Sequence, residues 1–242
     1  MDSTTCPQYM RCLFSAFVVI AFSISALGQG VHLGVQAGVP ITKFFKTGFS
    51  PSRYTGFGTQ YSAATRRYTV GFFMEYGFYR GLGLEVDAQY KRMGYVHDES
   101  IFSYSPNGSD TQFYDVKGSS WDFPVMVKYR FCRSKRPFVS GGGTFRHIGP
   151  VRARGVSNMS DPFPAWHTVS TQIDTSQPGE LDDRNFSGLT IGGGFEFGRG
   201  WLRFSPELHF THWLSNMGSA QSALRVNPNQ FEFLLGLDFF HR

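Results

Sequence analysis

The chain has 242 residues, a formal net charge of +5 and a hydrophobic fraction of 41%. Charged residues make up only 17% of it and aromatic residues another 17%, and 28 residues are glycine. Since the positive charge is modest and not gathered in one stripe, the composition argues against a nucleic-acid-binding protein. The length fits one domain of the barrel or sandwich type.

The first segment, residues 1–28, has the features of a secretory signal peptide. Arg11 precedes an apolar run over residues 13–27, which ends in the small residues that signal peptidase requires. We predict cleavage before Gln29, which makes residues 29–242 a single exported domain. An N-terminal membrane anchor is the alternative, but the run is short for a spanning helix of about 20 apolar residues.

The cysteines exclude an internal disulfide in the exported chain. Cys6 and Cys12 lie in the predicted signal peptide, so that Cys132 is the one cysteine left. We interpret Cys132, in a predicted turn, as a bystander rather than a reactive thiol. The exported chain must therefore gain its stability in some other way.

Most of the remaining chain alternates between apolar and polar residues with a period of two. Between Gly81 and Tyr95, for example, Leu84 and Val86 alternate with Glu85. This period is typical of a β-strand with one apolar and one polar face. The sequence predicts eight such strands, at residues 31–39, 67–79, 81–95, 115–131, 136–147, 186–198, 200–213 and 230–241.

The connections between these strands alternate in length. The tight connections lie at residues 80–81, 132–135 and 199–200. The longer connections lie at residues 40–66, 96–114, 148–185 and 214–229. This asymmetry is typical of outer-membrane barrels, which have short periplasmic turns and long external loops. We therefore expect an all-β fold: an eight-stranded, antiparallel, up-and-down transmembrane barrel.

The apolar face of each strand is rich in phenylalanine and other bulky residues. A soluble lipocalin-like barrel would turn this face inward, but so many bulky side chains would overfill an eight-stranded interior. We therefore expect the apolar face to contact lipid, with Tyr76, Tyr90, Trp121 and Tyr129 in aromatic girdles. The predicted lipid-facing residues are Phe72, Met74, Leu84, Val86, Val125, Val127, Phe204, Leu208, Phe233 and Leu235.

The polar face is mixed in sign, as a packed polar interior requires. Buried charges are tolerated only when they are paired and hydrogen-bonded, so we expect a paired network inside the barrel. We expect Asp87 to pair with a base such as Lys91 or Arg130. The predicted lumen charges are Glu75, Glu85, Asp87, Lys91, Lys128, Arg130, Glu196, Arg203, Glu207, Glu232 and Asp238.

Two prolines and two glycine triplets interrupt the strand pattern. Proline cannot donate to a β-ladder, so Pro124 and Pro206 predict a bulge or a local break. The triplets Gly141–Gly143 and Gly192–Gly194 lie in neighbouring predicted strands and indicate one thin patch of wall. This patch accommodates curvature, or it leaves room for a bulky lumen group or a lateral opening.

Motifs for catalysis or cofactor binding are lacking. The sequence has no His/Cys cluster with metal-ligand spacing and no phosphate-binding loop, so we predict no metal, no cofactor and no enzyme activity. Ser205, Glu207 and His209 share an inward face and could suggest a hydrolytic site. We interpret them as ordinary lumen residues because nothing indicates an exposed nucleophile.

The predicted external loops differ in charge. The first contains Lys43, Lys46, Arg53 and Arg66 without an acid, the second contains acids without a base, and the third is mixed. This pattern favours a surface that binds anionic lipopolysaccharide, cations or a partner protein. Alternatively, the acids of the second loop, Asp98, Glu99 and Asp110, simply neutralise the first loop.

The segments "VHLGVQAGVP", "GLGLEVDAQYKRMGY", "DFPVMVKYRF" and "RPFVSGGGTFRHIG" resemble the small outer-membrane β-barrel proteins of the PorT-like and OmpA-transmembrane-domain type. The resemblance covers most of the exported chain and implies the outer membrane of a Gram-negative-type bacterium. The final "FEFLLGLDFF" is similar to the terminal strand that barrel-assembly machinery recognises, although His241 and Arg242 follow it.

Three functions are compatible with these patterns. The first is a non-catalytic structural or binding protein with a side-chain-filled lumen and external loops. The second is a narrow passive pore for ions or small solutes. The third, which the sequence favours least, is an enzyme that modifies outer-membrane lipid.

Overall fold

The computed structural model describes the chain in segments, and every regular element in them is a β-strand. No helix among the described residues is long and apolar enough to span a membrane. The predicted signal peptide, Cys132, Arg53 and Arg66 lie outside the described residues. The described residues are 30–46, 48–51, 58–62, 67–79, 81–102, 109–131, 137–161, 167–175, 184–199, 202–214 and 225–239.

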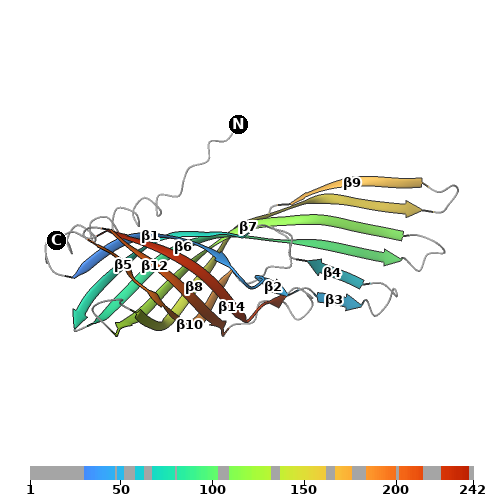
Figure 1. Ribbon diagram of the computed structural model, residues 1–242. Coiled ribbons are helices and arrows are strands. Elements are labelled where there is room, and N and C mark those ends of the chain that lie inside the picture. Colours follow the sequence, from blue (N-terminus) through green and yellow to red (C-terminus); the bar gives the residue numbers. More distant parts are fainter. Residues whose placement is uncertain are drawn as a thin grey trace.

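Eight strands form a closed antiparallel ring in which each strand pairs with its neighbours along the chain (Figure 1). The ring closes because β1 pairs with β14 as well as with β5, and because β6 pairs with β7. The predicted all-β, eight-stranded barrel is confirmed. The ring strands are β1 (Val31–Pro40), β5 (Thr69–Tyr79), β6 (Leu82–Phe102), β7 (Ser109–Arg130), β8 (Pro137–Asp161), β10 (Asn185–Phe195), β12 (Leu202–Trp213) and β14 (Asn229–Phe239).

Three of these strands continue far beyond the barrel and form an external sheet, which projects to the right in Figure 1. β6, β7 and β8 have 21, 22 and 25 residues, more than twice the length of β1. β4 (Gly58–Ser62) and β3 (Gly48–Pro51) extend this sheet beside β6, and β9 (His167–Thr175) extends it beside β8. We call this part the extension.

The extension corrects the predicted boundaries of the third, fourth and fifth strands. Residues 96–114 and 148–185 were predicted as long loops, but most of them continue the strands or form β9. Apolar and polar residues alternate less regularly in these segments, because the surroundings of the two strand faces change between the barrel and the extension, as described below. Two short strands, β2 (Phe45–Lys46) and β13 (Arg225–Val226), pair with each other, and β11 (Phe197–Arg199) pairs with β12.

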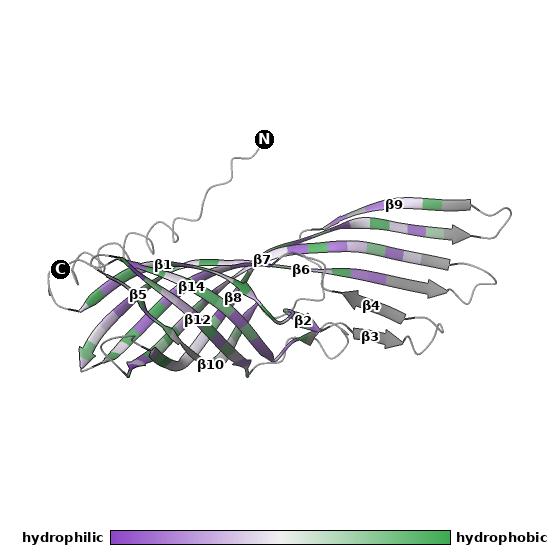
Figure 2. Ribbon diagram, viewed as in Figure 1, coloured by the Kyte–Doolittle hydropathy of each residue, from purple (hydrophilic) through white to green (hydrophobic). Residues whose placement is uncertain are grey.

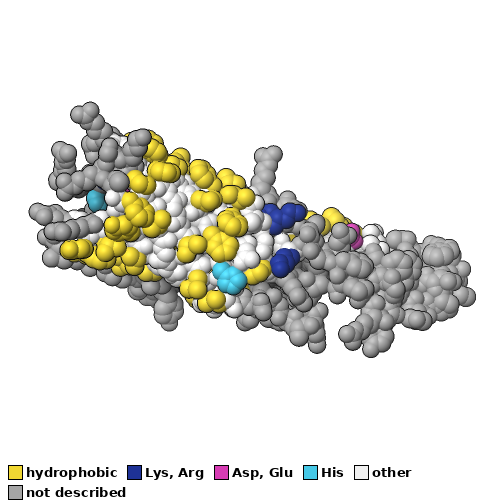
Figure 3. Space-filling model, turned by 60° about the horizontal axis from the view of Figure 1, so that its bottom comes forward, with side chains coloured by type: hydrophobic (Ala, Val, Ile, Leu, Met, Phe, Trp, Pro, Cys, Tyr) yellow, Lys and Arg dark blue, Asp and Glu magenta, His cyan; other side chains and the backbone are white. Residues whose placement is uncertain are grey.

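Within the barrel, apolar side chains point outward and polar ones inward. The outward positions include Val125, Val127 and Phe233, each between 46% and 48% exposed, while Lys128 between Val127 and Tyr129 is 2% exposed. Figure 3 shows hydrophobic side chains gathered over the wall on the face displayed, and dark blue Lys and Arg side chains where they end. This is the arrangement that a lipid environment selects.

Within the extension, the inward face becomes apolar. Met93, Tyr95, Val116 and Ala153 are buried there, at positions that continue the inward face of β6, β7 and β8. Figure 2 shows purple and green residues alternating along β6 to β9 beyond the barrel. β6 and β7 keep the same alternation of side chains, whereas in β8 it shifts by one residue, and the inward face changes from polar to apolar.

A β-bulge in β8 lies at the level of this reversal. Ser119 of β7 faces two residues of β8, Gly149 and Pro150, because the register shifts between Gly118 and Ser120. An extra residue bends a strand and increases its local twist. The bulge therefore marks the place where the wall ends and the extension begins.

Pro124 produces a local break without a bulge. β7 passes through Pro124 and pairs it with Thr144 of β8 in unchanged register. On the other side, the ladder with β6 lacks the pairs that would join Asp87 and Ala88 to Pro124 and Phe123. The missing donor of proline explains the gap.

Pro206 produces a similar break in the neighbouring strand. β12 runs through Pro206 and pairs it with Leu235 of β14. On the other side, the ladder lacks the pairs that would join Phe195 to Pro206 and Glu196 to Ser205, and the partner strand is interrupted at Glu196, between β10 and β11. The prediction of a bulge or local break is thus confirmed for both prolines, in the form of a break.

The two glycine triplets lie on adjacent strands, β8 and β10, in a ladder that is continuous along the whole of β10. They do not face each other directly, because each pairs with residues that flank the other. A Cβ atom at Gly192 would lie 2.6 Å from the His209 ring. Gly192 therefore leaves room for a lumen side chain, and the unbroken ladder provides no lateral opening.

Candidate functional site

The structure places all of the predicted lumen charges inside the ring of strands. Nine of these residues are at most 8% exposed, and the side chains of Arg130 and Arg203 are 14% and 11% exposed. They divide into a cluster near the tight turns and a cluster near the extension. We call the two ends of the barrel the turn-side mouth and the extension-side mouth.

Lys128 is the centre of the cluster deepest in the turn-side half. Its Nζ lies 2.7 Å from Glu85, 3.4 Å from Glu207 and 3.8 Å from Glu75. Glu75 and Glu85 are directly opposite each other on β5 and β6, a like-charge pair that destabilises a sheet unless a cation bridges it. Lys128 supplies that cation, and His209 lies 3.0 Å from Glu207.

Two arginines extend this cluster to the turn-side mouth. Arg130 lies 2.5 Å from Glu75 and 2.7 Å from Glu196. Arg203 lies 2.7 Å from the other oxygen of Glu196 and 3.8 Å from Asp238. Glu196 lies in the gap between β10 and β11, so the break opposite Pro206 coincides with the carboxylate that both arginines share.

Asp87 is buried without the basic partner that the sequence predicted. The amides of Gln36 and Gln89 each donate to its Oδ2 at 3.1 Å. Lys91 and Arg130 instead pair with other acids. The prediction was wrong because the alternation shows which face a residue occupies but not which residue faces it across the lumen.

The cluster near the extension is organised by Arg146, which the sequence analysis missed. Its Nε and Nη2 donate to the two carboxylate oxygens of Asp122, both at 2.6 Å. Lys91 lies 3.0 Å from Asp122 and also binds Glu232, which accepts a further hydrogen bond from Thr69. Asp122 could have been found from its inward position in the alternation.

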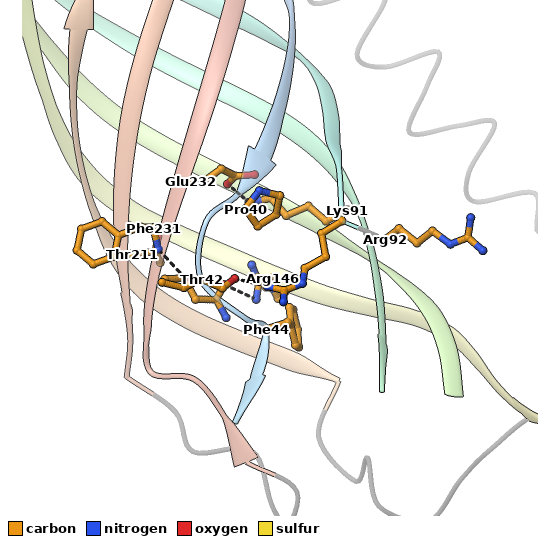
Figure 4. A pocket seen from close by; sticks show the side chains of 11 residues that line it. Pro40, Thr42, Phe44, Lys91, Arg92, Arg146, Thr211, Phe231 and Glu232 are labelled. Carbon is orange, nitrogen blue, oxygen red and sulfur yellow. Dashed lines mark hydrogen bonds and ion pairs between the residues drawn. The ribbon is translucent and has the colours of Figure 1, made fainter. Parts of the chain in front are cut away.

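An apolar cap covers this cluster at the extension-side mouth. The guanidinium of Arg146 lies 4.6 Å from the ring centre of Phe44 and 4.1 Å from that of Trp213. Figure 4 shows Phe44 beside Arg146, on the segment that follows β1. The cap consists of Phe44, Phe45, Met93, Tyr95, Val116, Ile148, Val151, Ala153, Phe186 and Trp213.

Little space remains beneath the cap. The cavity drawn in Figure 4, lined by Thr42, Lys91, Arg146 and Glu232 among others, has a volume of about 20 Å³. This is room for about one water molecule. A larger space of about 390 Å³ lies at the turn-side mouth, between His32, Arg130 and Arg203. The lumen is therefore a cup that is closed toward the extension.

The structure places the predicted lipid-facing residues on the outside of the barrel. Met74 and Val86 are half-buried between neighbouring side chains, and the other eight are exposed. Of the predicted girdle residues, Tyr90 and Trp121 pair across β6 and β7 with ring centres 5.5 Å apart. Tyr76 and Tyr129 are exposed near the turn-side ends of β5 and β7.

The geometry does not favour catalysis at the positions considered from the sequence. Ser205, Glu207 and His209 are each at most 6% exposed, and Lys128 lies 3.4 Å from Glu207. A substrate would have to displace this packed network to reach Ser205. Among the described residues, no group of His, Cys, Asp and Glu could hold a metal ion.

The outward face of the extension carries ion pairs in water. Arg152 donates to both oxygens of Asp174, at 2.7 and 2.6 Å, and Arg154 lies 3.8 Å from the same carboxylate. The hydrogen bonds from Arg152 lower the pKa of Asp174 below its usual value, and the same contact raises the pKa of Arg152. Lys117 pairs with Asp115 at 2.5 Å.

Comparison with known proteins agrees with this architecture. Residues 25–218 match the family described as "Outer membrane protein beta-barrel domain". The chain therefore belongs to this family and is a protein of the outer membrane. No curated protein matches the chain.

Two of the solved structures that match the chain are of Ail, the attachment invasion locus protein of Yersinia pestis. One, in complex with the heparin analogue sucrose octasulfate, is 12% identical and covers 87% of this chain and 99% of its own, with a TM-score of 0.30. The other is 11% identical and covers 87% of this chain and 97% of its own, with a TM-score of 0.32.

Proposed function

We propose that this protein is a non-catalytic outer-membrane barrel that acts through its extension, as a structural or binding protein. The observation that carries this proposal is the sealed lumen. Solutes that enter the turn-side mouth meet the ion-paired side chains around Lys128, then those around Arg146, and finally the apolar cap. The extension offers exposed polar surface on strands that are anchored in the barrel.

The orientation follows from the lengths of the connections. Short turns of bacterial outer-membrane barrels lie in the periplasm and long segments outside the cell, which places the extension outside. We further propose that residues 1–28 are a cleaved signal peptide and that residues 29–242 form a barrel of the PorT-like or OmpA-transmembrane-domain type. β14 would carry the signal for barrel-assembly machinery.

Outer-membrane lipid, including lipopolysaccharide, is the partner that the outward wall fits best. The wall presents exposed aliphatic and aromatic side chains, and its strands pair with one another around a closed ring, as a bilayer requires. A lipid-modifying enzyme would need a reactive group on this surface. The Ser205, Glu207 and His209 constellation instead points into the packed lumen, which supports a protein without enzyme activity.

A narrow pore is the competing function, and the open turn-side mouth favours it. Two barriers in series, the ion-paired side chains and the cap, oppose conduction. In planar bilayers the unmodified protein should therefore conduct little or nothing. Stable, large channels in the unmodified protein would overturn the sealed-lumen proposal and establish the pore.

Variants can separate the two barriers. Lys128→Ala or Arg203→Ala loosens the network and should give only brief openings, because the cap remains. Phe44→Ala with Phe45→Ala removes part of the cap, and combining this pair with Lys128→Ala should give the largest conductance. A matched control, Val127→Ala on the lipid-facing side, should stay silent. Faster migration of unboiled than boiled protein on a denaturing gel checks that each variant still forms a closed barrel.

A further inference from the structure

Four basic residues lie on the outward face of β6, β7 and β8, just beyond the barrel wall. They are exposed and alternate with the buried Met93, Val116 and Ala153, which face the interior of the extension. Lys117, for example, is followed along β7 by Trp121 at the top of the wall. We call this set the outer basic row: Arg92, Lys117, Arg152 and Arg154.

The row lies at the height expected for lipid phosphate groups. Arg92 is two residues beyond Tyr90, and Lys117 is four residues beyond Trp121, which is about 7 and 13 Å along the strands. Strands in such barrels tilt by about 35–45°, which reduces these distances to roughly 5–10 Å above the aromatic pair. The polar interface of a bilayer leaflet is roughly 5–8 Å thick.

Among the described residues, two carboxylates form ion pairs with this row of four bases. Lys117 lies directly opposite Arg152 on neighbouring strands, a like-charge pair that destabilises a sheet. Asp115 pairs with Lys117, and a single carboxylate, that of Asp174, serves both Arg152 and Arg154. An anion placed between Lys117 and Arg152 would remove the remaining repulsion.

An exposed apolar pair follows beyond the row. Phe113 of β7 and Val156 of β8 are directly opposite each other on the same outward face, and they are 51% and 39% exposed. From the barrel outward, this face therefore presents the Tyr90–Trp121 pair, then the outer basic row, and then the exposed apolar pair of Phe113 and Val156. Acyl chains, phosphate groups and the apolar faces of sugar rings follow one another in the same order in a glycolipid of the outer leaflet.

We propose that the outer basic row binds the phosphate groups of lipopolysaccharide, with the Tyr90–Trp121 pair against its acyl chains and Phe113 against its sugars. This inference rests on the proposed orientation, with the extension outside the cell. It assigns the lipid to one side of the barrel, the wall formed by β6, β7 and β8. The bound lipid would hold the extension at a fixed height above the membrane.

The test compares lipopolysaccharide binding by the purified, full-length exported chain and its variants in mild detergent. The probes are lipopolysaccharide, the same lipid after enzymatic removal of its phosphates, and inorganic phosphate. Lys117→Ala with Arg152→Ala should weaken binding of the phosphorylated lipid about 10- to 30-fold, because each base near a lipid surface contributes roughly a three- to fivefold factor. The dephosphorylated lipid should bind weakly to all variants alike.

Two further variants test whether lipid binding follows the charge of the outer basic row. Asp174→Asn frees Arg152 and Arg154 and should tighten binding of the phosphorylated lipid. Lys43→Ala with Lys46→Ala removes two exposed bases that do not lie on the outward face of β6–β8, and it should change binding less than twofold. Equal binding by unmodified protein and the Lys117→Ala, Arg152→Ala variant would overturn the proposal, as would inorganic phosphate competing as well as the lipid.

Failure of this proposal and failure of the sealed barrel give different results. If the row does not bind lipid, the double variant binds as the unmodified protein does, while both still show the heat-dependent gel shift and no conductance. If the proposed function fails, the unmodified protein conducts or lacks the gel shift, whatever lipid it binds.

Discussion

The strands β6, β7 and β8 bury polar side chains in the barrel but apolar side chains in the extension. On β6, Val86 faces outward and Asp87 inward within the wall, whereas Arg92 faces outward and Met93 inward a few residues later. The alternation itself does not change, since side chains of a strand always point to opposite faces in turn. What changes is the surrounding solvent, from lipid to water.

This comparison shows that the surroundings, rather than the strand, decide which face is apolar. In lipid the apolar face lies outside, and the polar face is tolerated inside because its charges are paired or hydrogen-bonded. In water the apolar face lies inside and builds the cap. The reversal occurs at residues 92–93 of β6 and near the bulge opposite Ser119, and we propose that it marks the outer boundary of the hydrocarbon region.

The largest expected effect comes from the polar interior of the barrel. Arg146→Ala would leave Asp122 without its bidentate partner and would remove a side chain packed between Phe44 and Trp213. Removing one member of a buried pair costs roughly 3–5 kcal/mol. We expect that loss in the free energy of unfolding, measured by urea denaturation in lipid vesicles.

Arg152→Ala is the matched control for Arg146→Ala in the extension. Arg152 also forms a bidentate pair, with Asp174, but this pair is exposed to water, where ion pairs contribute little. The urea midpoint of this variant should therefore stay close to that of the unmodified protein. Similar losses in both variants would contradict the assignment of one pair to a sealed lumen and the other to water.

The loss of stability caused by an introduced charge should depend on its position along β6. Val86 and Val96 share the outward face of β6, but Val86 lies in the wall and Val96 in the extension. Val86→Arg should cost about 2–4 kcal/mol if it lies near the midplane of the bilayer. Val96→Arg faces water opposite Asp115, and it should change the free energy of unfolding by less than about 0.5 kcal/mol.

Fluorescent labels can check the faces without relying on stability. A label at position 86 should be quenched by quenchers attached to lipid chains, whereas labels at positions 87 and 96 should not. Quenching at 87 but not at 86 would show that the polar face of the barrel contacts lipid and that the apolar face lies inside. Quenching at 96 would move the hydrocarbon boundary into the extension and would also remove the basis for the outer basic row.

The smallest effect concerns pH and the extension alone. Because Arg152 lowers the pKa of Asp174, this pair stabilises the contact of β8 and β9 above the usual carboxyl pKa of about 4. The stabilisation is lost as the pH falls through the lower pKa of the folded state. Hydrogen exchange of the β9 amides should therefore change little between pH 7 and 5, after correction for intrinsic rates, and increase below pH 4.

Asp174→Asn provides the control for this pH dependence. The variant lacks the titrating carboxyl group, so the opening of β9 should no longer depend on pH in the acid range. An equally strong acid dependence in the variant would show that another group controls the contact of β8 and β9.

The sequence predicted the barrel because lipid imposes a simple pattern on it. Phe72, Val125 and Phe233 all follow the period of two with bulky apolar residues, and tight turns separate the strands at one end. The number of strands and the faces within the wall follow from this pattern alone. The breaks at Pro124 and Pro206 were also predictable, because proline lacks a backbone donor wherever it stands.

The extension and the pairing inside the lumen could not be predicted in the same way. Beyond Tyr95 the outward face mixes charged residues with apolar ones such as Phe113 and Val156, and the segment contains glycine, serine and asparagine, so that strand and loop look alike in sequence. Gln36, which bonds to Asp87, lies on β1, two strands from β6 in the ring, and alternation along β6 does not reveal it. Arg146 pairs with Asp122 directly opposite it on β7, a contact that depends on the exact register of the two strands. Phe44 and Phe45 belong to the cap, but they lie on a segment without period-two alternation, so the pattern did not indicate that they are buried.

The length of β7 and β8 also has a mechanical consequence. At roughly 3.3 Å per residue, the 25 residues of β8 span about 80 Å from the turn-side mouth to the tip of the extension. A force applied at the tip would run along the strand axis and load the ladders of β6, β7 and β8 in shear, with many hydrogen bonds sharing it at once. Because β6, β7 and β8 are continuous strands from the wall into the extension, a protein oriented as proposed would transmit tension from outside the cell directly into the membrane-embedded wall.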